Sequence, residues 1–441
     1  MVDPAIVKFL AALEETQYLA PDRMEVYQRR LLDRLLRHAR SQTAFYADRL
    51  APMFRADDSI DWDRWSEIPI FTRTEAQENE NALVARSTPA AAGPSKPDAT
   101  SGSTGRPLRL ANSNIQSTAG ACANERYLRW HKIDPRGLSA FIMFFDPGEA
   151  SYPDGDFSSI SRLVDGDSPK VALNIDTPIF RQVEWLRRMK PATVMSFPTN
   201  LREIGRIAAE QGQPLSFDAV FTYGEALTPE LRAAIRSYFG RDPIDNYGST
   251  EIGHIAATCP HSWKLHVAAD LVKVEVVDKD GHPADPGTIG RVVATSFYNY
   301  ATPFIRYDCG DLGILAVEPC GCGRTLPTLE CIVGRSRNIF RFADGTTALP
   351  RLESPYVQPF VPHRQFQVVQ TAPDRIEYRY VPLAPGQSID LAGLTTLVRQ
   401  RLHPSLTVEA IAVAEIPRSP SGKYEDYVCL IGDGVPQGRI I

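Results

Sequence analysis

The sequence predicts an α/β protein in which a large N-terminal domain with mixed sheets precedes a small α+β C-terminal domain. Its 441 residues exceed one ordinary hydrophobic core, so one large and one smaller domain are expected. The middle of the chain alternates β-rich runs with helical patterns, and patterns typical of antiparallel strands begin after Leu271. We therefore expect domains at residues 1–334 and 335–441.

Composition narrows the classes of protein and partner. Hydrophobic residues make up 43% and charged residues 23%, as in soluble globular proteins. The net charge of −5 gives no support for a nucleic-acid or acidic-membrane partner, and the longest apolar stretch, near Ala140–Phe145, is too short to span a bilayer. The N-terminus lacks a signal-peptide pattern, and seven cysteines, an odd number, argue against a secreted disulfide framework. We expect a cytoplasmic protein.

The first elements are a helix and a loop. Residues Asp22–Arg40 carry apolar side chains at helical spacing with arginines between them, which predicts an amphipathic helix with a solvated basic face. Residues Ser87–Ala99 contain three prolines and a run of alanines, so we expect a loop there.

The central region predicts βαβ units. The segments Val194–Phe197 and Ala219–Tyr223 are β-rich, and Ile179–Met189 and Thr228–Tyr238 have helical patterns. Such alternation favours a parallel sheet.

The remaining elements are mainly strands. Val272–Val277 and Arg291–Phe297 resemble antiparallel strands joined by a turn at residues 280–287. From about Gly334 the tail predicts a small α+β domain. We expect strands at Gln365–Gln370 and Arg375–Tyr380, a helix near Leu391–Leu402 and a further strand at Val408–Ala414.

Five short segments carry most of the functional information. They are Thr100–Pro107, Tyr247–Glu251, Arg306–Asp311, Gly334–Ser336 and Ser421–Lys423. Each is weak alone, since a loop rich in Ser, Thr and Gly is often a plain surface connection. In this order they resemble the adenylate-forming superfamily, and most of all its branch of phenylacetate–CoA ligases and coenzyme F390 synthetases, from about Tyr46 to Lys423.

This resemblance implies a two-step ligase. The large domain would bind ATP and a carboxylic acid, which react with Mg²⁺ to give an acyl-adenylate and pyrophosphate. The small domain would be a mobile lid that rotates before the thiol of CoA displaces AMP. The alternatives are an enzyme that passes the acyl group to a carrier protein or an amine, or AMP to a hydroxyl, and an inactive nucleotide-binding regulatory relative. The oligomeric state stays open, with a homodimer as one option.

The first segment implies a phosphate-binding loop. By the resemblance its hydroxyls and backbone N–H groups wrap the β- and γ-phosphates of ATP, and glycines allow the close approach. Arg106 stands where the family usually has lysine; it keeps the charge and can bind phosphate oxygens through two nitrogens. The remaining expected contacts are Ser101, Gly102, Ser103, Thr104 and Gly105.

The second segment implies contacts to adenine, phosphate and metal. By the resemblance Tyr247 stacks on adenine beside Gly248, Thr250 contacts the α-phosphate and Glu251 holds Mg²⁺. A carboxylate suits that hard cation. The alternative is a buried tyrosine followed by a helix N-cap at Ser249 or Thr250.

Further nucleotide contacts come from three other places. Gly224 and Glu225 resemble the loop that flanks the adenine, although the segment alone reads as a turn. Asp311 would accept both ribose hydroxyls, as carboxylates do in dinucleotide sites. The alternative is a surface ion pair between Asp311 and Arg306. Arg335 would contact the ribose or phosphate at the hinge.

The hinge and the C-terminal loop complete the expected catalytic set. The hinge departs from the family pattern, because Arg337 stands where Asp or Lys is usual and Asn338 follows. By the resemblance Lys423 bridges the carboxylate and the phosphate during adenylation, where cations must neutralise developing charge. Without the resemblance, an exposed lysine in a tail is usually inert.

A second constellation is independent of ATP. Cys259, His266 and the Cys320-Gly-Cys322 pair can form a closed Cys₃His tetrahedral zinc site, and related chains in this branch carry the same pattern. A closed set of ligands points to a structural metal, since no position remains for water. His261 is a competing ligand, and the alternative is four unliganded residues.

For the pocket that would bind the carboxylic acid, the sequence offers only candidate residues. Phe141 and Phe145 precede the sheet region, and His254 and Ala256 follow the Tyr247 segment. Aromatic rows are more often core than pocket. If part of this set lines a cavity, a flat aromatic or arylacetic acid suits it better than acetate.

Overall fold

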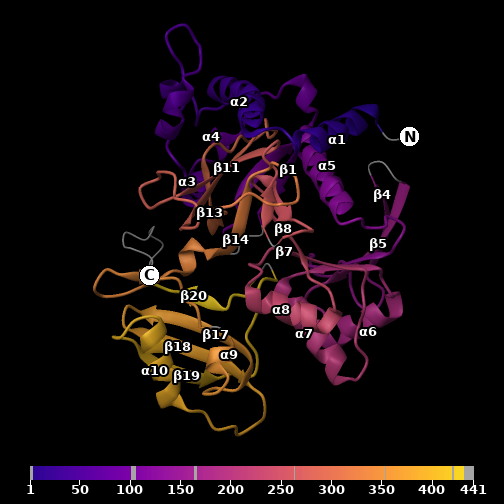
Figure 1. Cartoon of the computed structure of the whole chain (residues 1–441), viewed down its shortest axis with the longest axis vertical. Coiled ribbons are helices and arrows are strands. Elements are labelled where there is room, and N and C mark those ends of the chain that lie inside the picture. The colour runs from indigo at the N-terminus through magenta and orange to yellow at the C-terminus, as the bar shows by residue number, and fades with distance from the viewer. Residues whose placement is uncertain are drawn as a thin grey trace. The chain divides into compact units, whose positions relative to one another are not determined.

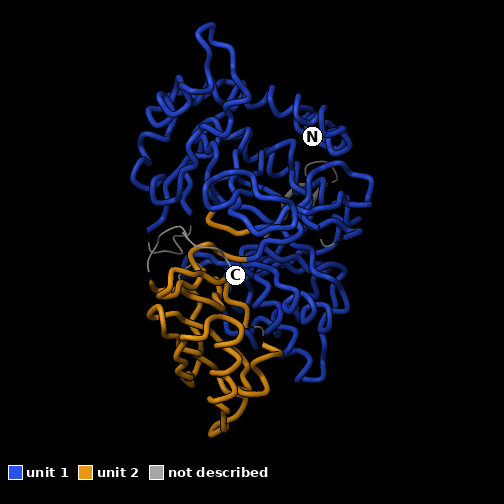
Figure 2. Tube along the Cα trace, turned by 60° about the vertical axis from the view of Figure 1, so that its left-hand side comes forward, with its two compact units in different colours: residues 1–309, 313–333 blue, residues 310–312, 334–441 orange. Residues whose placement is uncertain are grey.

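The computed structural model describes residues 3–100, 106–162, 166–262, 264–352, 354–419 and 422–431. The chain divides into two compact units, shown in two colours in Figure 2. The large unit comprises residues 1–309 and 313–333, and the small unit comprises residues 310–312 and 334–441.

The large unit contains eight α-helices within the described residues, of very different lengths. They are α1 (Pro4–Thr16), α2 (Pro21–Gln42), α3 (Arg73–Glu78), α4 (Glu80–Leu83), α5 (Asn114–Trp130), α6 (Ile179–Met189), α7 (Pro198–Glu210) and α8 (Pro229–Phe239). No helix in the described part of the chain is both long and apolar enough to cross a membrane.

Most strands of the large unit form one twelve-stranded sheet. Its order is β11-β12-β13-β14-β10-β9-β8-β7-β6-β3-β5-β4. The strands are β3 (Ser139–Met143), β4 (Asp156–Arg162), β5 (Gly166–Asn174), β6 (Thr193–Ser196), β7 (Ala219–Tyr223), β8 (Ile244–Ser249), β9 (Gly253–Thr258), β10 (Leu265–Val267), β11 (Val272–Val277), β12 (Ile289–Ser296), β13 (Tyr307–Leu315) and β14 (Thr328–Arg335).

One half of this sheet is the predicted parallel βαβ region. Strands β5, β3, β6, β7 and β8 pair in parallel. The helices α6, α7 and α8 lie side by side along this half (Figure 1). Helix α8 shows why these boundaries arise: the hydroxyl of Thr228 caps its first turn, Pro229 follows, and Gly240 ends it in the left-handed conformation.

The other half is antiparallel, so the prediction of a mixed sheet is confirmed. Strand β9 pairs antiparallel with both β8 and β10, and β10 pairs antiparallel with β14. The predicted pair at Val272–Val277 and Arg291–Phe297 is β11 and β12, which run antiparallel.

The loop predicted at Ser87–Ala99 is only partly a loop. Its last residues form β1 (Ser95–Ala99), which pairs antiparallel with β2 (Arg109–Ser113) in a separate two-stranded sheet. Pro97 lies in β1, and a sheet of two strands tolerates proline because each strand is an edge. This pair supports both ends of the Thr100 segment.

The small unit is α+β, as predicted. Its main sheet has the order β19-β18-β17-β20, with an antiparallel centre and parallel outer strands. The elements are β15 (Phe340–Arg341), β16 (Thr347–Ala348), α9 (Ser354–Val357), β17 (His363–Ala372), β18 (Arg375–Pro382), α10 (Leu391–Arg401), β19 (Thr407–Ala412) and β20 (Tyr427–Cys429). Leu394 and Val398 of α10 are fully buried in its apolar core.

Candidate active site

The base of the Thr100 segment is closed by hydrogen bonds. Residues 101–105, and with them Ser101, Gly102, Ser103, Thr104 and Gly105, lie outside the described residues. On one side, the buried Thr100 exchanges hydrogen bonds with Leu108: its backbone N–H donates to the Leu108 carbonyl (3.0 Å), and its Oγ1 accepts from the Leu108 N–H (2.9 Å). On the other side, Arg106 is largely exposed and donates to the carbonyl of Gln77 (2.9 Å).

The second segment follows the carboxyl end of the parallel strands. Tyr247 and Gly248 lie at the end of β8, where a register shift interrupts the pairing with β9. A side chain at position 248 would place its Cβ 2.5 Å from the carbonyl oxygen of Gly253, so only glycine fits. Ser249 Oγ accepts from the N–H of Ile252 (3.2 Å) across a tight turn. Since β9 follows instead of a helix, the helix N-cap alternative is wrong.

Glu251 is a buried carboxylate held from two sides. Its Oε1 accepts from Nη1 of Arg73 (3.0 Å) and from the hydroxyl of Tyr307 (3.0 Å). Burial, followed by the Glu251 charge, raises the pKa of Tyr307 well above its usual range, so the hydroxyl stays a donor. Within the described residues, Oε2 carries no hydrogen bond. This oxygen is available to a cation.

Arg73 is a residue that the sequence motifs did not single out. It begins α3, directly after Thr72, whose hydroxyl caps the helix. Its Nη2 donates to Thr100 Oγ1 and to the carbonyl of Arg106 (3.4 Å). One guanidinium therefore contacts both ends of the Thr100 segment and also Glu251.

Gly224 and Glu225 follow β7. Gly224 is exposed with φ of +76°, a conformation that favours glycine. The carboxylate of Glu225 accepts from the backbone N–H (3.2 Å) and hydroxyl (2.8 Å) of Thr199, in the first turn of α7. Glu225 thus stabilises a helix N-terminus at the edge where parallel strands end.

Asp311 and Arg335 lie together in the small unit. Arg335 Nε is 3.0 Å from Asp311 Oδ1, and the carboxylate is mostly buried. Arg306 is buried, donates to the carbonyl oxygens of Ser66 and Ile68, and pairs with Glu275 (3.1 Å). The alternative of a surface pair between Asp311 and Arg306 is therefore wrong.

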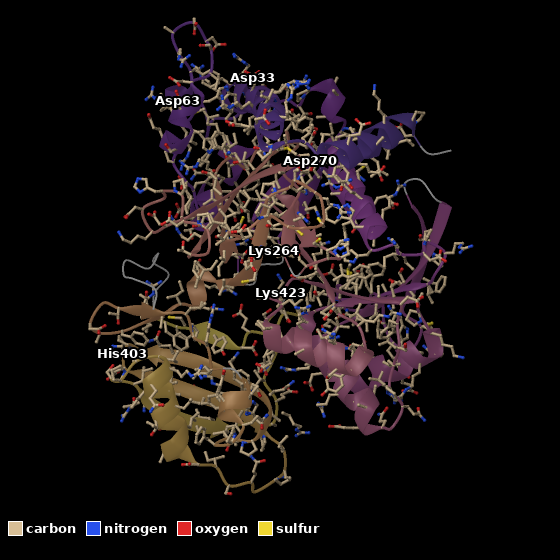
Figure 3. The ribbon with its side chains drawn as sticks, in the orientation of Figure 1. Asp33, Asp63, Lys264, Asp270, His403 and Lys423 are labelled. Atoms are coloured by element: carbon tan, nitrogen blue, oxygen red, sulfur yellow. The ribbon has the colours of Figure 1, made fainter. Side chains whose placement is uncertain are left out.

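Lys423 lies in the small unit, where it contacts Ser419 (Lys423 is labelled in Figure 3). The N–H of Ser419 donates to the Lys423 carbonyl (2.8 Å), and the Lys423 N–H donates to Ser419 Oγ (3.2 Å). Arg337, the departure from the family hinge, forms an ion pair with Glu425 two residues after Lys423. The atypical hinge residue thus contacts the segment between Lys423 and β20.

The predicted metal ligands form one cluster in the large unit. The ligand atoms of Cys259, His266, Cys320 and Cys322 all lie within 4.8 Å of one another. The sulfurs of Cys259 and Cys320 are 3.6 Å apart, close to the edge of a tetrahedron with Zn–S bonds of about 2.3 Å and too long for a disulfide. His261 is exposed and outside this group, which favours His266 as the imidazole ligand.

Hydrogen bonds around the cluster suit thiolate ligands. His266 Nε2 faces the sulfur of Cys322 (3.2 Å), while Nδ1 faces the carbonyl of Leu326 (3.2 Å). The carbonyl can accept only from a protonated Nδ1, which leaves Nε2 for a metal. The backbone N–H groups of His261 and Arg324 donate to the sulfurs of Cys259 and Cys322 (both 3.5 Å).

The acid-pocket candidates are not in one place. Phe141 is partly exposed on β3, with the Lys170 ammonium 5.3 Å from its ring centre, and Phe145 follows β3. His254 on β9 stacks on Tyr127 at 5.9 Å, and Ala256 is fully buried in the apolar core. Three strands separate β3 from β9, about 19 Å across the sheet.

Sequence comparisons give partial matches. No family model matches the chain. Over 163 residues it is 29% identical to a phenylacetate–coenzyme A ligase of Thermus thermophilus, covering 35% of this chain and 37% of that protein. Over 203 residues it is 26% identical to a phenylacetate–coenzyme A ligase of Escherichia coli, covering 43% and 45%. The chain thus matches less than half the length of these curated relatives.

Structural comparison covers nearly the whole chain. A 2-hydroxyisobutyryl-CoA ligase in the postadenylation state superimposes with a TM-score of 0.70 over 91% of this chain and 88% of that one, at 21% identity. This agreement concerns the fold. The resemblance inferred from the five segments is confirmed: the chain has the fold of the adenylate-forming superfamily, and its sequence is similar to the phenylacetate–CoA ligase branch.

Proposed function

We propose that the protein is an AMP-forming acid–thiol ligase, which activates a carboxylic acid with ATP and transfers the acyl group to CoA. The observation that carries this proposal is the arrangement around Glu251. A buried carboxylate with one free oxygen is joined through Arg73 to both ends of the Thr100 segment. Such an arrangement suits a cation and an anionic phosphate chain side by side.

The residues of the large unit then have separate roles. Glu251 would hold Mg²⁺ through Oε2, and the metal would neutralise phosphate charge. Thr250, in the same turn, would contact the α-phosphate. Tyr247 would stack on adenine, and Arg106 would leave its contact with Gln77 to bind phosphate oxygens.

The small unit would supply the remaining groups. Asp311 would accept the ribose hydroxyls, with Arg335 holding its carboxylate in place. Lys423 would face the reacting carboxylate and phosphate during adenylation only. The small unit would therefore act as a mobile lid that changes position before the thiol attacks.

The cysteine cluster would hold one structural zinc ion. The donor set suits zinc, since three sulfurs and one imidazole nitrogen lie within 4.8 Å of one another, and these are the number and kinds of ligand that a structural zinc takes. Bound zinc would tie the loop after β9 and the strand β10 to the loop between β13 and β14.

For the acid we propose an aromatic or arylacetic compound. Similarity to two phenylacetate–coenzyme A ligases supports this choice. Because Phe141 and His254 lie on strands far apart in the sheet, one of the two sides must provide the ring pocket alone. The side of β9 is favoured, because the stacked pair of His254 and Tyr127 adjoins the turn that carries Glu251.

The test is ATP–pyrophosphate exchange with benzoate, phenylacetate, indoleacetate, hexanoate and acetate at equal concentration. We expect at least a tenfold preference for an aromatic acid over acetate, roughly the discrimination that extra apolar contacts supply. A preferred short aliphatic acid would contradict the aromatic proposal alone. Exchange with none of a broad range of acids would contradict the ligase itself. Adding CoA or a phosphopantetheine carrier afterwards identifies the acceptor.

A further inference from the structure

A cleft of about 450 Å³ in the large unit is lined by none of the residues assigned above to ATP or the acid. Its lining comes from the ends of α1 and α5 and from the two loops that carry the cysteines. Four lining side chains are cationic, Arg126, Arg129, Lys132 and Arg324, and one, Glu14, is a carboxylate. The cleft is therefore rich in positive charge.

Only part of that charge is neutralised. Arg126 is buried and pairs with the fully buried Asp270 (Nη2–Oδ1, 3.1 Å; Asp270 is labelled in Figure 3). Arg129 pairs with Glu14 (2.7 Å) and Glu125 (3.2 Å). These contacts neutralise the charges of the two arginines of α5, but not the charges of the other two cations that line the cleft.

Arg324 and Lys132 are those remaining cations. Neither forms an ion pair within the described part of the chain, and the buried Nε of Arg126 has no acceptor there. An anion in the cleft is favoured, because it would balance the charges of Arg324 and Lys132.

Arg324 is held in place before any ligand binds. Its guanidinium lies 4.4 Å from the ring centre of Trp130, and its Nε donates to the side-chain oxygen of Gln17 (3.1 Å). The indole N–H of Trp130 donates to the same oxygen (2.8 Å). Because these contacts use only one edge of the guanidinium, its terminal nitrogens stay available with little entropy left to lose.

We propose that this cleft binds a phosphate-bearing anion through Arg324 and Lys132. Phosphate oxygens match the planar guanidinium and accept several hydrogen bonds at once. The ligand is either a free polyphosphate or the phosphates of a nucleotide. The site is separate from the proposed adenylation site, so it does not depend on the ligase activity.

The experiment is calorimetric titration of the full-length protein with inorganic pyrophosphate and, separately, with adenosine 3′,5′-bisphosphate. We expect saturable binding of at least one probe, and the tighter probe identifies the source of the phosphate. Arg324→Gln and Lys132→Gln should each weaken this binding about tenfold, the usual effect of losing one charge-assisted hydrogen bond. Arg136→Gln should leave it unchanged, since Arg136 is 85% exposed, pairs with Asp134 and lies outside the cleft.

The two variants protect the test against a folding defect. Arg324 is two residues from Cys322, and its backbone N–H donates to the Cys322 sulfur, so a backbone shift caused by its replacement can disturb the cysteine cluster. Lys132 is exposed beyond the end of α5 and makes no such contact within the described residues. Binding that neither variant weakens lies elsewhere and overturns the proposal, as does the absence of binding of both probes at millimolar concentration. Pyrophosphate exchange, measured in parallel, reports on the ligase activity alone.

Discussion

Arg73 Nη1 lies 3.0 Å from Glu251 Oε1, and Nη2 of the same side chain donates to Thr100 Oγ1. Arg73 thereby connects two segments that are far apart in the sequence. The hydroxyl of Tyr307 occupies the same carboxylate oxygen from another direction. As a result two donors hold Oε1, while Oε2 accepts no hydrogen bond within the described residues and can bind a cation.

Replacing Arg73 should impair adenylation more than folding. We expect Arg73→Ala to lower kcat/KM for ATP about 100-fold in pyrophosphate exchange, because charge-assisted hydrogen bonds contribute about 1.5–3 kcal/mol each. The concentration of Mg²⁺ needed for half-maximal rate should rise as well. Arg73→Lys should recover part of the activity, since it keeps the charge but only one direction of donation. Initial rates at varied ATP and Mg²⁺ measure these effects.

Arg64→Ala is the matched control for Arg73, because Arg64 pairs with Glu67 at the surface. It should leave all kinetic constants unchanged. If Arg73→Ala lowers the melting temperature but keeps normal ATP and Mg²⁺ dependence, Arg73 has a packing role and no influence on the site.

The sequence predicts those elements whose signal is local. The helix at Ile179–Met189 and the strand at Val272–Val277 agree with the structure in both bounds, because their periodicity and flanking residues decide them. Strand β1 could not be found this way. It depends on pairing with β2, and its proline argues against a strand unless both strands are edges.

In the candidate active site, too, only residues with a local sequence signal could be predicted. Motifs locate Glu251 and Asp311, but Arg73 has no motif of its own, and its importance arises from a contact with a residue 178 positions away. The spacing of residues in the sequence also cannot show whether His261 or His266 is the histidine ligand of the predicted zinc site. The choice is made by β10, which holds His266 between β9 and β14 and buries its imidazole.

Lys423→Ala should separate the two proposed half-reactions. We expect acyl-adenylate formation to fall at least 100-fold, since charge stabilisation at a reacting phosphate contributes on the order of 3 kcal/mol. Thioester formation from a supplied acyl-adenylate should stay within about twofold of the wild-type rate. Lys279→Ala, at an exposed turn where Lys279 pairs with Asp280, is the control. An equal fall in both steps would show that Lys423 is structural or that one lid position serves both.

Purified protein should contain one zinc ion per chain. Cys320→Ser should remove the metal and lower the melting temperature by on the order of 5 °C, because a structural metal contributes directly to folding. The ATP affinity of the remaining folded protein should change little. Cys331→Ser, a partly buried cysteine of the same unit outside the cluster, should retain zinc. If elemental analysis finds no zinc in protein that was prepared without chelators, the proposed zinc site is wrong.

His254 should make the protein less stable as the pH falls. Burial, followed by the nearby Arg126, lowers the pKa of His254 to about 4, and Asp270 opposes this only in part. In the unfolded chain the pKa of this histidine is near 6.5. Between pH 6.5 and pH 4 the unfolded chain therefore binds a proton that the folded protein does not, and the folded protein loses stability as the pH falls through this range.

His254→Asn should remove about 2 kcal/mol of the difference in unfolding free energy between pH 7 and pH 4.5. Urea unfolding at several pH values measures it, with His282→Asn as control because that side chain is 75% exposed. Parallel pH curves for wild type and His254→Asn would show that the imidazole gains its proton in the folded state.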